Sequence, residues 1–199
     1  MDYPKTIKDL IACFKKLPGV GEKTAERYAL SILNSDLEFT DMFSDTLRNV
    51  KTKIKRCSIC NNYSEEEICP ICNDKSRDNN VICVVEEPKN VIIFEKIGTY
   101  NGLYHVLDGL ISPLDGVNPE DIKIDSLIKR INDNKIDEVI IAVKPSIEGE
   151  TTALYISKLL ENKNIKITKI AHGVPLGADM DYIDALTLEL ALENRTQIS

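Results

Sequence analysis

The sequence predicts an α/β protein: an N-terminal helical region, a small four-cysteine module, and a domain with a parallel sheet flanked by helices. Apolar residues near the N-terminus recur at helical spacing, and four cysteines stand in two close pairs. From about residue 80, strand-like apolar runs alternate with helical segments. Such alternation is typical of a parallel sheet with helices on its faces. A C-terminal segment with a closing helix completes the chain.

Three helices are expected in the N-terminal region, residues 1–56. In the first and third, apolar side chains recur three or four residues apart, as they do on one face of a helix. Thr6 and Asp9 are placed as a capping box for the first helix, and a Pro-Gly pair ends it. The expected helices cover residues 6–17, 22–33 and 40–55.

The stretch LPGVGEKTAER, between the first two helices, has the composition of a phosphate-holding hairpin. Gly19 and Gly21 permit a tight turn with exposed backbone amides, which can point at a phosphate together with the N-terminus of the next helix. Lys23 and Arg27 stand four residues apart and so share a helix face. The pattern matches the helix-hairpin-helix motif, which contacts nucleic-acid backbones without reading sequence. A plain helical hairpin is the alternative that spacing alone leaves open.

The four-cysteine module covers residues 57–72 and reads CSICNNYSEEEICPIC. Each C-x₂-C pair can turn both sulfurs toward one point, and two such pairs supply four thiolates at the corners of a tetrahedron. That arrangement suits zinc, with Cys57, Cys60, Cys69 and Cys72 as ligands. No catalytic partner stands nearby, so the zinc is expected to be structural. Iron–sulfur ligation and buried or disulfide-linked cysteines are the alternatives.

The third part, residues 80–173, is expected to form a sheet domain of the Toprim type found in topoisomerases and primases. A metal-dependent phosphotransfer site in such a domain needs several carboxylates converging on magnesium. Glu86 and Glu87 end the first strand, but the later strand end reads Ala142-Val143-Lys144 where an Asp-x-Asp pair is expected. Because this pair is missing, the protein is expected not to be an enzyme. A metal-dependent nuclease or nucleotidyl-transfer enzyme is the alternative. The expected strands cover residues 81–87, 103–107, 137–143 and 165–171.

Two further groups of polar residues are weaker candidates. His105 and His172 are the only histidines, and neither stands beside a nucleophile; His105, in an expected strand, is interpreted as structural. Asp179, Asp181 and Asp184 faintly resemble a Walker B acid site, but the chain lacks the phosphate loop that such a site needs. The stretch is therefore interpreted as an assembly segment, residues 174–199, with a helix at 182–194.

Charge and composition limit the classes of partner. The chain of 199 residues has a net charge of −7. Residues 1–56 carry 11 basic and 8 acidic side chains, a net of +3, whereas the remainder carries 14 and 24, a net of −10. The net charge by itself argues against a nucleic-acid partner, but binding depends on where the positive charge lies, and the N-terminal region is mildly basic. No apolar run approaches membrane-spanning length and no signal peptide is evident, so a cytoplasmic protein with reduced cysteines is expected.

Taken together, these parts resemble the RecR family of bacterial recombination mediators. The resemblance covers nearly the whole chain and rests on six stretches, from LPGVGEKTAERYA and CSICNNYSEEEICPIC through ICVVEEPKNV, YHVLDGLISPLDGV and KPSIEGETTALYI to HGVPLGADMDYIDALTLELAL. One departure is the reading AVKP where the family more often has ATNP. This departure puts the details of the partner surface near Lys144 in doubt, and it adds to the case against catalysis.

The resemblance implies a DNA-repair role without catalysis. Members form dimers and ring-like tetramers, bind single-stranded and double-stranded DNA and junctions, and act with RecO and in many bacteria with RecF. Together they help to load RecA onto single-stranded DNA covered by single-strand binding protein. By the same resemblance, Lys23 and Arg27 are DNA contacts and Glu148 belongs to the surface for RecO.

Overall fold

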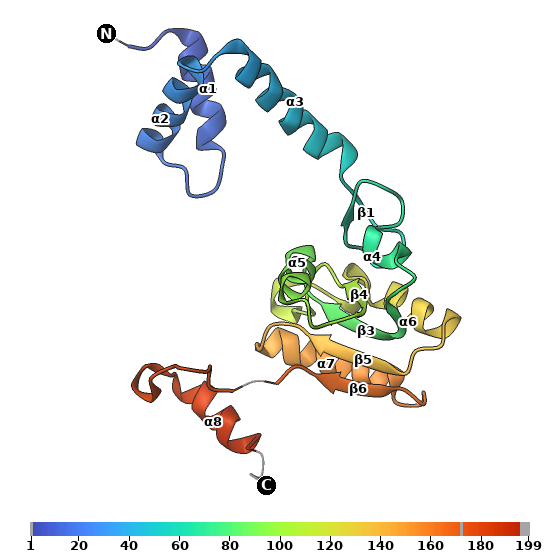
Figure 1. The fold of residues 1–199 in the computed structure, drawn as a ribbon. Helices are drawn as coiled ribbons and strands as arrows, with labels where there is room; N and C mark the ends of the chain where they lie inside the picture. Colours follow the sequence, from blue (N-terminus) through green and yellow to red (C-terminus); the bar gives the residue numbers. More distant parts are fainter. Residues whose placement is uncertain (1, 172, 196–199) are drawn as a thin grey trace. The chain divides into compact units, whose positions relative to one another are not determined.

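The computed structural model describes residues 2–171 and 173–195 and separates into two compact units, Met1–Ile54 and Lys55–Ser199 (Figure 1). In the described residues, the first unit contains only helices and the loops that connect them, and the second contains all of the strands. No helix of the described residues is both long enough and apolar enough to cross a membrane.

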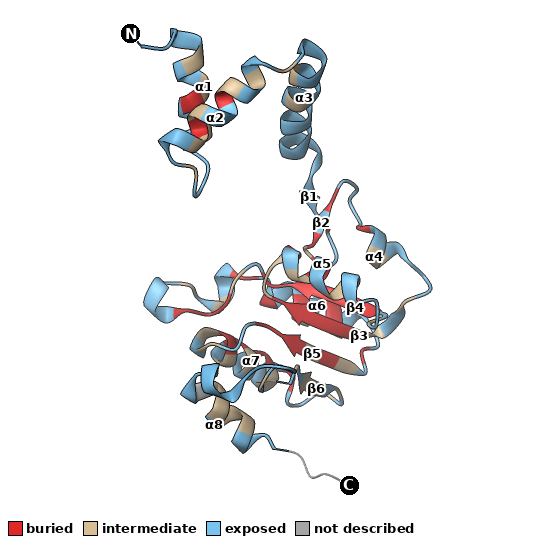
Figure 2. Cartoon of the chain, turned by 60° about the vertical axis from the view of Figure 1, so that its left-hand side comes forward, coloured by how far each residue is buried: buried red, intermediate tan, exposed pale blue. Residues whose placement is uncertain are grey.

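The first unit holds three helices, of which two pack together. Ile11, Ala25 and Ala29 are buried between the first two helices. The small alanine side chains let the two helix backbones approach closely. The third helix has no buried residue and is mostly exposed in Figure 2. The helices are α1 (Lys5–Lys15), α2 (Glu22–Leu33) and α3 (Leu37–Lys53).

Two helix starts differ from expectation. The capping box at Thr6 is wrong, because α1 begins at Lys5 after Pro4 and no side chain caps it. Helix α3 begins at Leu37, three residues before the expected start. The side chain of Asp36 accepts a hydrogen bond from the Phe39 amide at 2.7 Å, and this is the usual role of aspartate at a helix N-cap.

The second unit begins with the cysteine module. Its two short strands pair antiparallel, with Lys55 opposite Ser64 and Arg56 opposite Tyr63. A single helical turn carries the last cysteine and begins at a proline, which is favoured at that position. These elements are β1 (Lys55–Arg56), β2 (Tyr63–Ser64) and α4 (Pro70–Asn73).

A parallel sheet of four strands, in the order β4-β3-β5-β6, forms the body of the second unit (Figure 1). Val84 in its centre lies opposite His105 on one side and Ile141 on the other. On the outer side of β4, three alternate carbonyls accept side-chain hydrogen bonds: Gly102 from Arg77, Tyr104 from Arg130 and Val106 from Asn61. The strands are β3 (Asp78–Val85), β4 (Gly102–Val106), β5 (Glu138–Ala142) and β6 (Lys166–Lys169).

Alternate strand residues point to opposite sides of this sheet. Both faces carry apolar side chains, and helices cover both of them. Leucine and isoleucine side chains of α6 (Ile124–Asp133) and α7 (Ile147–Leu160) pack on one face. Val91 and Phe94 of α5 (Pro88–Ile97) pack on the other, against Tyr104. Short helical turns at Pro113–Asp115 and Pro119–Asp121 precede α6, and a third, Met180–Tyr182, precedes the closing helix α8 (Ala185–Glu193).

Candidate nucleic-acid interface and metal centre

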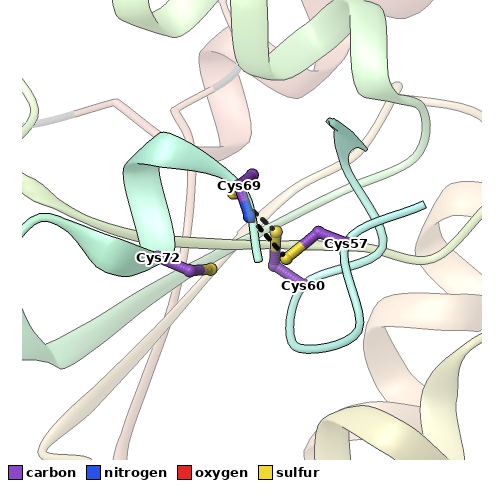
Figure 3. Close-up of side chains that lie close together, drawn as sticks. All are labelled: Cys57, Cys60, Cys69 and Cys72. Atoms are coloured by element: carbon purple, nitrogen blue, oxygen red, sulfur yellow. Dashed lines mark hydrogen bonds between the residues drawn. The ribbon is translucent and has the colours of Figure 1, made fainter. Parts of the chain in front are cut away.

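The four cysteines converge on one point (Figure 3). Cys57 and Cys60 come from the loop between β1 and β2, and Cys69 and Cys72 come from the start and body of α4. All four Sγ atoms lie within 4.8 Å of one another, and Cys60 Sγ lies 3.6 Å from Cys69 Sγ. The first three cysteines are buried and Cys72 is partly exposed.

This geometry fits a tetrahedral zinc ion. With Zn–S bonds of about 2.3 Å, neighbouring sulfurs of a tetrahedron lie about 3.8 Å apart, which is close to the Cys60–Cys69 separation. The Cys69 amide donates to Cys57 Sγ at 3.3 Å, and such amide–thiolate bonds orient the ligands of a metal. A thiolate donor set with no ligand position left open belongs to a structural site rather than a catalytic one.

The thiols influence one another strongly. Hydrogen bonds from Cys60 and Cys72 lower the pKa of Cys69 to about 2, whereas the same contact raises the pKa of Cys60. These contacts favour the thiolate form of Cys69, which is the form of cysteine that binds a metal.

The first cysteine pair is fastened to the sheet. Asn61 adopts a left-handed conformation (φ 61°) between the cysteine pair and β2, a conformation that asparagine tolerates well. The Val106 amide donates to the carbonyl of Cys60 at 2.9 Å, and the Asn61 side chain donates back to Val106 at 3.1 Å. Arg56 adds an ion pair to Asp108 at 2.6 Å. The metal would therefore stabilise a module that is continuous with the sheet domain.

The hairpin presents an uncapped helix N-terminus. Gly19 has φ 75°, a left-handed conformation that favours glycine, and Gly21 is the extended N-cap of α2. The first helical hydrogen bond runs from the Ala25 amide to Gly21 O at 2.9 Å. No side chain of the described residues caps α2, so its first amides remain available to an anion.

The two predicted cations of this hairpin are accessible. Lys23 and Arg27 are exposed on α2 and form no ion pair with any described residue. The nearby acids are engaged elsewhere: Glu22 pairs with Lys15, and Glu26 accepts a hydrogen bond from the Tyr3 hydroxyl. The structure therefore brings an uncapped helix end and two unpaired cations onto one short element.

The carboxyl edge of the sheet does not assemble a carboxylate cluster among the residues that the structure describes. Glu86, after β3, lies 3.6 Å from the ammonium of Lys144, which follows β5. Glu87 caps α5 in a reciprocal pair of hydrogen bonds with Asn90. A lysine ammonium beside Glu86 occupies the place where a metal-dependent enzyme needs a further acid.

Glu148 lies in the first turn of α7, where a negative charge is favoured by the helix dipole. Hydrogen bonding from Ser146 lowers the pKa of Glu148. Its neighbour Glu150 pairs with Lys169 at 2.9 Å. The turn itself requires glycine at position 149, because a Cβ there would lie 2.0 Å from the carbonyl of Lys144.

The remaining polar candidates have structural surroundings. His105 is fully buried, and its Nε2 lies 2.9 Å from the carbonyl of Lys123; His172 lies outside the described residues. Asp184 caps α8 by accepting from the amide and hydroxyl of Thr187. Asp179 likewise accepts from the amide of Asp181. The three aspartates of the C-terminal segment therefore include two helix caps.

Comparison with protein families gives four successive matches between residues 7 and 196. A Toprim domain model matches residues 80–171. Three models described as RecR domains match the rest: the helix-hairpin-helix over residues 7–51, the four-cysteine zinc finger over 54–74 and the C-terminal domain over 173–196. The predicted order of parts is confirmed, and the four clustered cysteines are the ligands of one structural zinc ion.

Proposed function

Because the chain belongs to the RecR family, and is thus a DNA-binding mediator of recombinational repair, we propose that it works with RecO, and with RecF where present, to load RecA at gaps and junctions. The uncapped N-terminus of α2 beside Lys23 and Arg27 is the observation that carries the DNA-binding part. Contacts of this kind engage the phosphate backbone, so binding would be salt-dependent and nearly indifferent to sequence.

A homo-oligomer would bring several hairpins to one DNA strand. Exposed apolar side chains support this part of the proposal, because large apolar surfaces usually mark contacts between proteins. Helix α3 has no buried residue, and the C-terminal segment exposes further large side chains. Weak contacts by single subunits would then add up through multivalency. The exposed residues include Leu37, Met42, Leu47 and Val50 of α3 and Leu176, Tyr182 and Leu192 of the C-terminal segment.

The decisive experiment is fluorescence anisotropy of a labelled gapped DNA titrated with the wild type and with Lys23→Ala/Arg27→Ala at matched oligomeric state. Lys5→Ala/Lys8→Ala, on α1, is the control that removes the same charge. Loss of binding in the first variant alone supports the proposal. The salt slope should also fall by about 0.7 for each lost phosphate contact with single-stranded DNA. Equal binding by all three proteins would refute it.

We propose further that the protein does not cut or join DNA, because the Lys144 ammonium pairs with Glu86 at the sheet edge. Incubation with Mg²⁺ or Mn²⁺ and gapped, nicked or supercoiled DNA should leave the DNA unchanged. Metal-dependent cleavage that disappears in Glu86→Gln would establish the enzyme alternative instead.

The partner surface is proposed at the start of α7. Glu148→Gln should weaken the binding of RecO measured by surface plasmon resonance, whereas Glu150→Gln, at the neighbouring ion-paired carboxylate, should not. Unchanged affinity in Glu148→Gln would place the RecO contact elsewhere.

A further inference from the structure

An open pocket of about 570 Å³ is lined by residues of the cysteine module and of helix α6 of the sheet domain. Cys72, the zinc ligand that is only partly buried, lines it. Arg130 lines it from α6, together with the exposed Lys129 and Asp133. The zinc centre and a buried cation of a different element therefore face the same space.

Arg130 is an unusual arginine for this protein. Its side chain is buried, with the residue only 9% exposed, and Nη1 donates to the carbonyl of Tyr104 at 2.6 Å. The other two arginines near the module each pair with carboxylates, Arg56 with Asp108 and Arg77 with Glu95 and Asp74. Arg130 forms no ion pair with a carboxylate anywhere in residues 2–171 or 173–195. A buried charge without a counter-charge is strongly destabilising.

The loaded zinc site supplies the missing negative charge. Four thiolates around a divalent cation leave a net charge of about −2 on the cluster. Hydrogen bonds such as that from the Cys69 amide offset part of this charge, but they do not neutralise it. Lys129 and Asp133 are exposed, so water screens their effect on the cluster.

We propose that Arg130 is the counter-ion of the zinc–thiolate centre, and that α6 thereby helps the cysteine module to retain its metal. The guanidinium acts across the pocket on the side of Cys72, the least buried of the four cysteines. Arg130 is a positioning residue for the metal centre and not one of its ligands.

The test compares three substitutions of Arg130 in the full-length zinc protein. Arg130→Lys keeps the charge, Arg130→Gln keeps an N–H donor for the Tyr104 carbonyl without the charge, and Arg130→Met keeps only the apolar stem. Lys129→Met is the matched control, because it removes an exposed cation that lines the same cavity. The readout is the rate of zinc transfer to an excess of a coloured chelator, well below the unfolding temperature of every variant.

Loss of the counter-ion should speed zinc release by about tenfold or more in Arg130→Gln and Arg130→Met, a size usual for residues that support metal ligands. Arg130→Lys and Lys129→Met should stay close to the wild type. In the cobalt-substituted protein, the sulfur-to-metal charge-transfer bands should shift in the two neutral variants alone.

Two results would overturn the proposal. If Arg130→Gln releases zinc as slowly as the wild type while Arg130→Met is fast, the residue acts only through its hydrogen bond to Tyr104. If every variant matches Lys129→Met, the zinc centre does not depend on the Arg130 charge. If Arg130→Met does not fold, the comparison of Arg130→Gln with Arg130→Lys still decides between charge and packing.

Discussion

His105 should make the stability of the second unit depend on pH. Its ring is fully buried on β4, and Nε2–H donates to the carbonyl of Lys123. The other nitrogen, Nδ1, is buried and has no hydrogen-bond partner among the described residues. A proton added at Nδ1 would place a positive charge in the core with nothing to accept it.

The size of the effect follows from the pKa of this ring. The pKa of His105 is lowered from 6.5 to about 4; burial is the main cause, the bond to the Lys123 carbonyl opposes it, and the nearby Arg130 charge adds to it. Between pH 6.5 and about 4, His105 is protonated in the unfolded chain but remains neutral in the folded chain. Stability is therefore lost as the pH falls from about 6.5 to about 4, and the loss amounts to roughly 3 kcal/mol.

The assay is urea unfolding at a series of pH values for the wild type and for His105→Gln, whose amide can still donate to the Lys123 carbonyl. Carboxylates and the zinc thiolates contribute equally to both proteins, so the difference between the two curves isolates His105. The wild type should lose about 3 kcal/mol relative to the variant across the window. Titration of the single histidine resonance in a His172→Gln background gives the pKa of His105 directly.

Parallel curves for the two proteins would refute this reasoning. So would a His105 resonance that titrates near pH 6.5, because the ring would then accept a proton without resistance from the core.

Three further outcomes are expected. Gly149→Ala should lower the free energy of unfolding by about 1–3 kcal/mol or more, because its Cβ would meet the Lys144 carbonyl, whereas Gly173→Ala, which adds a methyl into open space, should not; equal melting temperatures would contradict this. Asp36→Ala should lower the free energy of unfolding by about 1 kcal/mol, because it removes the N-cap of α3. A urea unfolding curve unchanged from the wild type would exclude that role. Strong chelators should remove hydrogen-exchange protection from residues 57–72 and leave α1 and α2 protected, so retained protection in the metal-free protein would show that the module folds without zinc.

The parts predictable from the sequence are those that depend on neighbours along the chain. Apolar runs indicate all four strands of the parallel sheet to within a few residues, and the spacing of the cysteines indicates their convergence. The helix starts show the limit of such reasoning. Thr6 and Asp9 form a plausible cap, but the chain enters α1 one residue earlier, while Asp36 begins α3 ahead of its first obvious apolar residue.

Contacts between distant segments could not be predicted in this way. The pairing of Lys144 with Glu86 depends on β5 lying beside β3, and the pairing of Arg56 with Asp108 depends on the module docking at the end of β4. No local pattern marks Arg130 as buried, since its helical neighbours include exposed charged residues. Such residues acquire their surroundings only from the order of strands in the sheet.

The side chains along β4 have a consequence for aggregation and for partners. An outermost strand is open to pairing with another chain through its unused carbonyls and amides. Here Arg77, Arg130 and Asn61 occupy successive outward carbonyls of β4, and the cysteine module takes the amide of Val106 as well. While zinc holds the module in place, the edge strand β4 therefore cannot pair with a further strand. An extended peptide that adds to the sheet would have to pair with the opposite edge strand, β6.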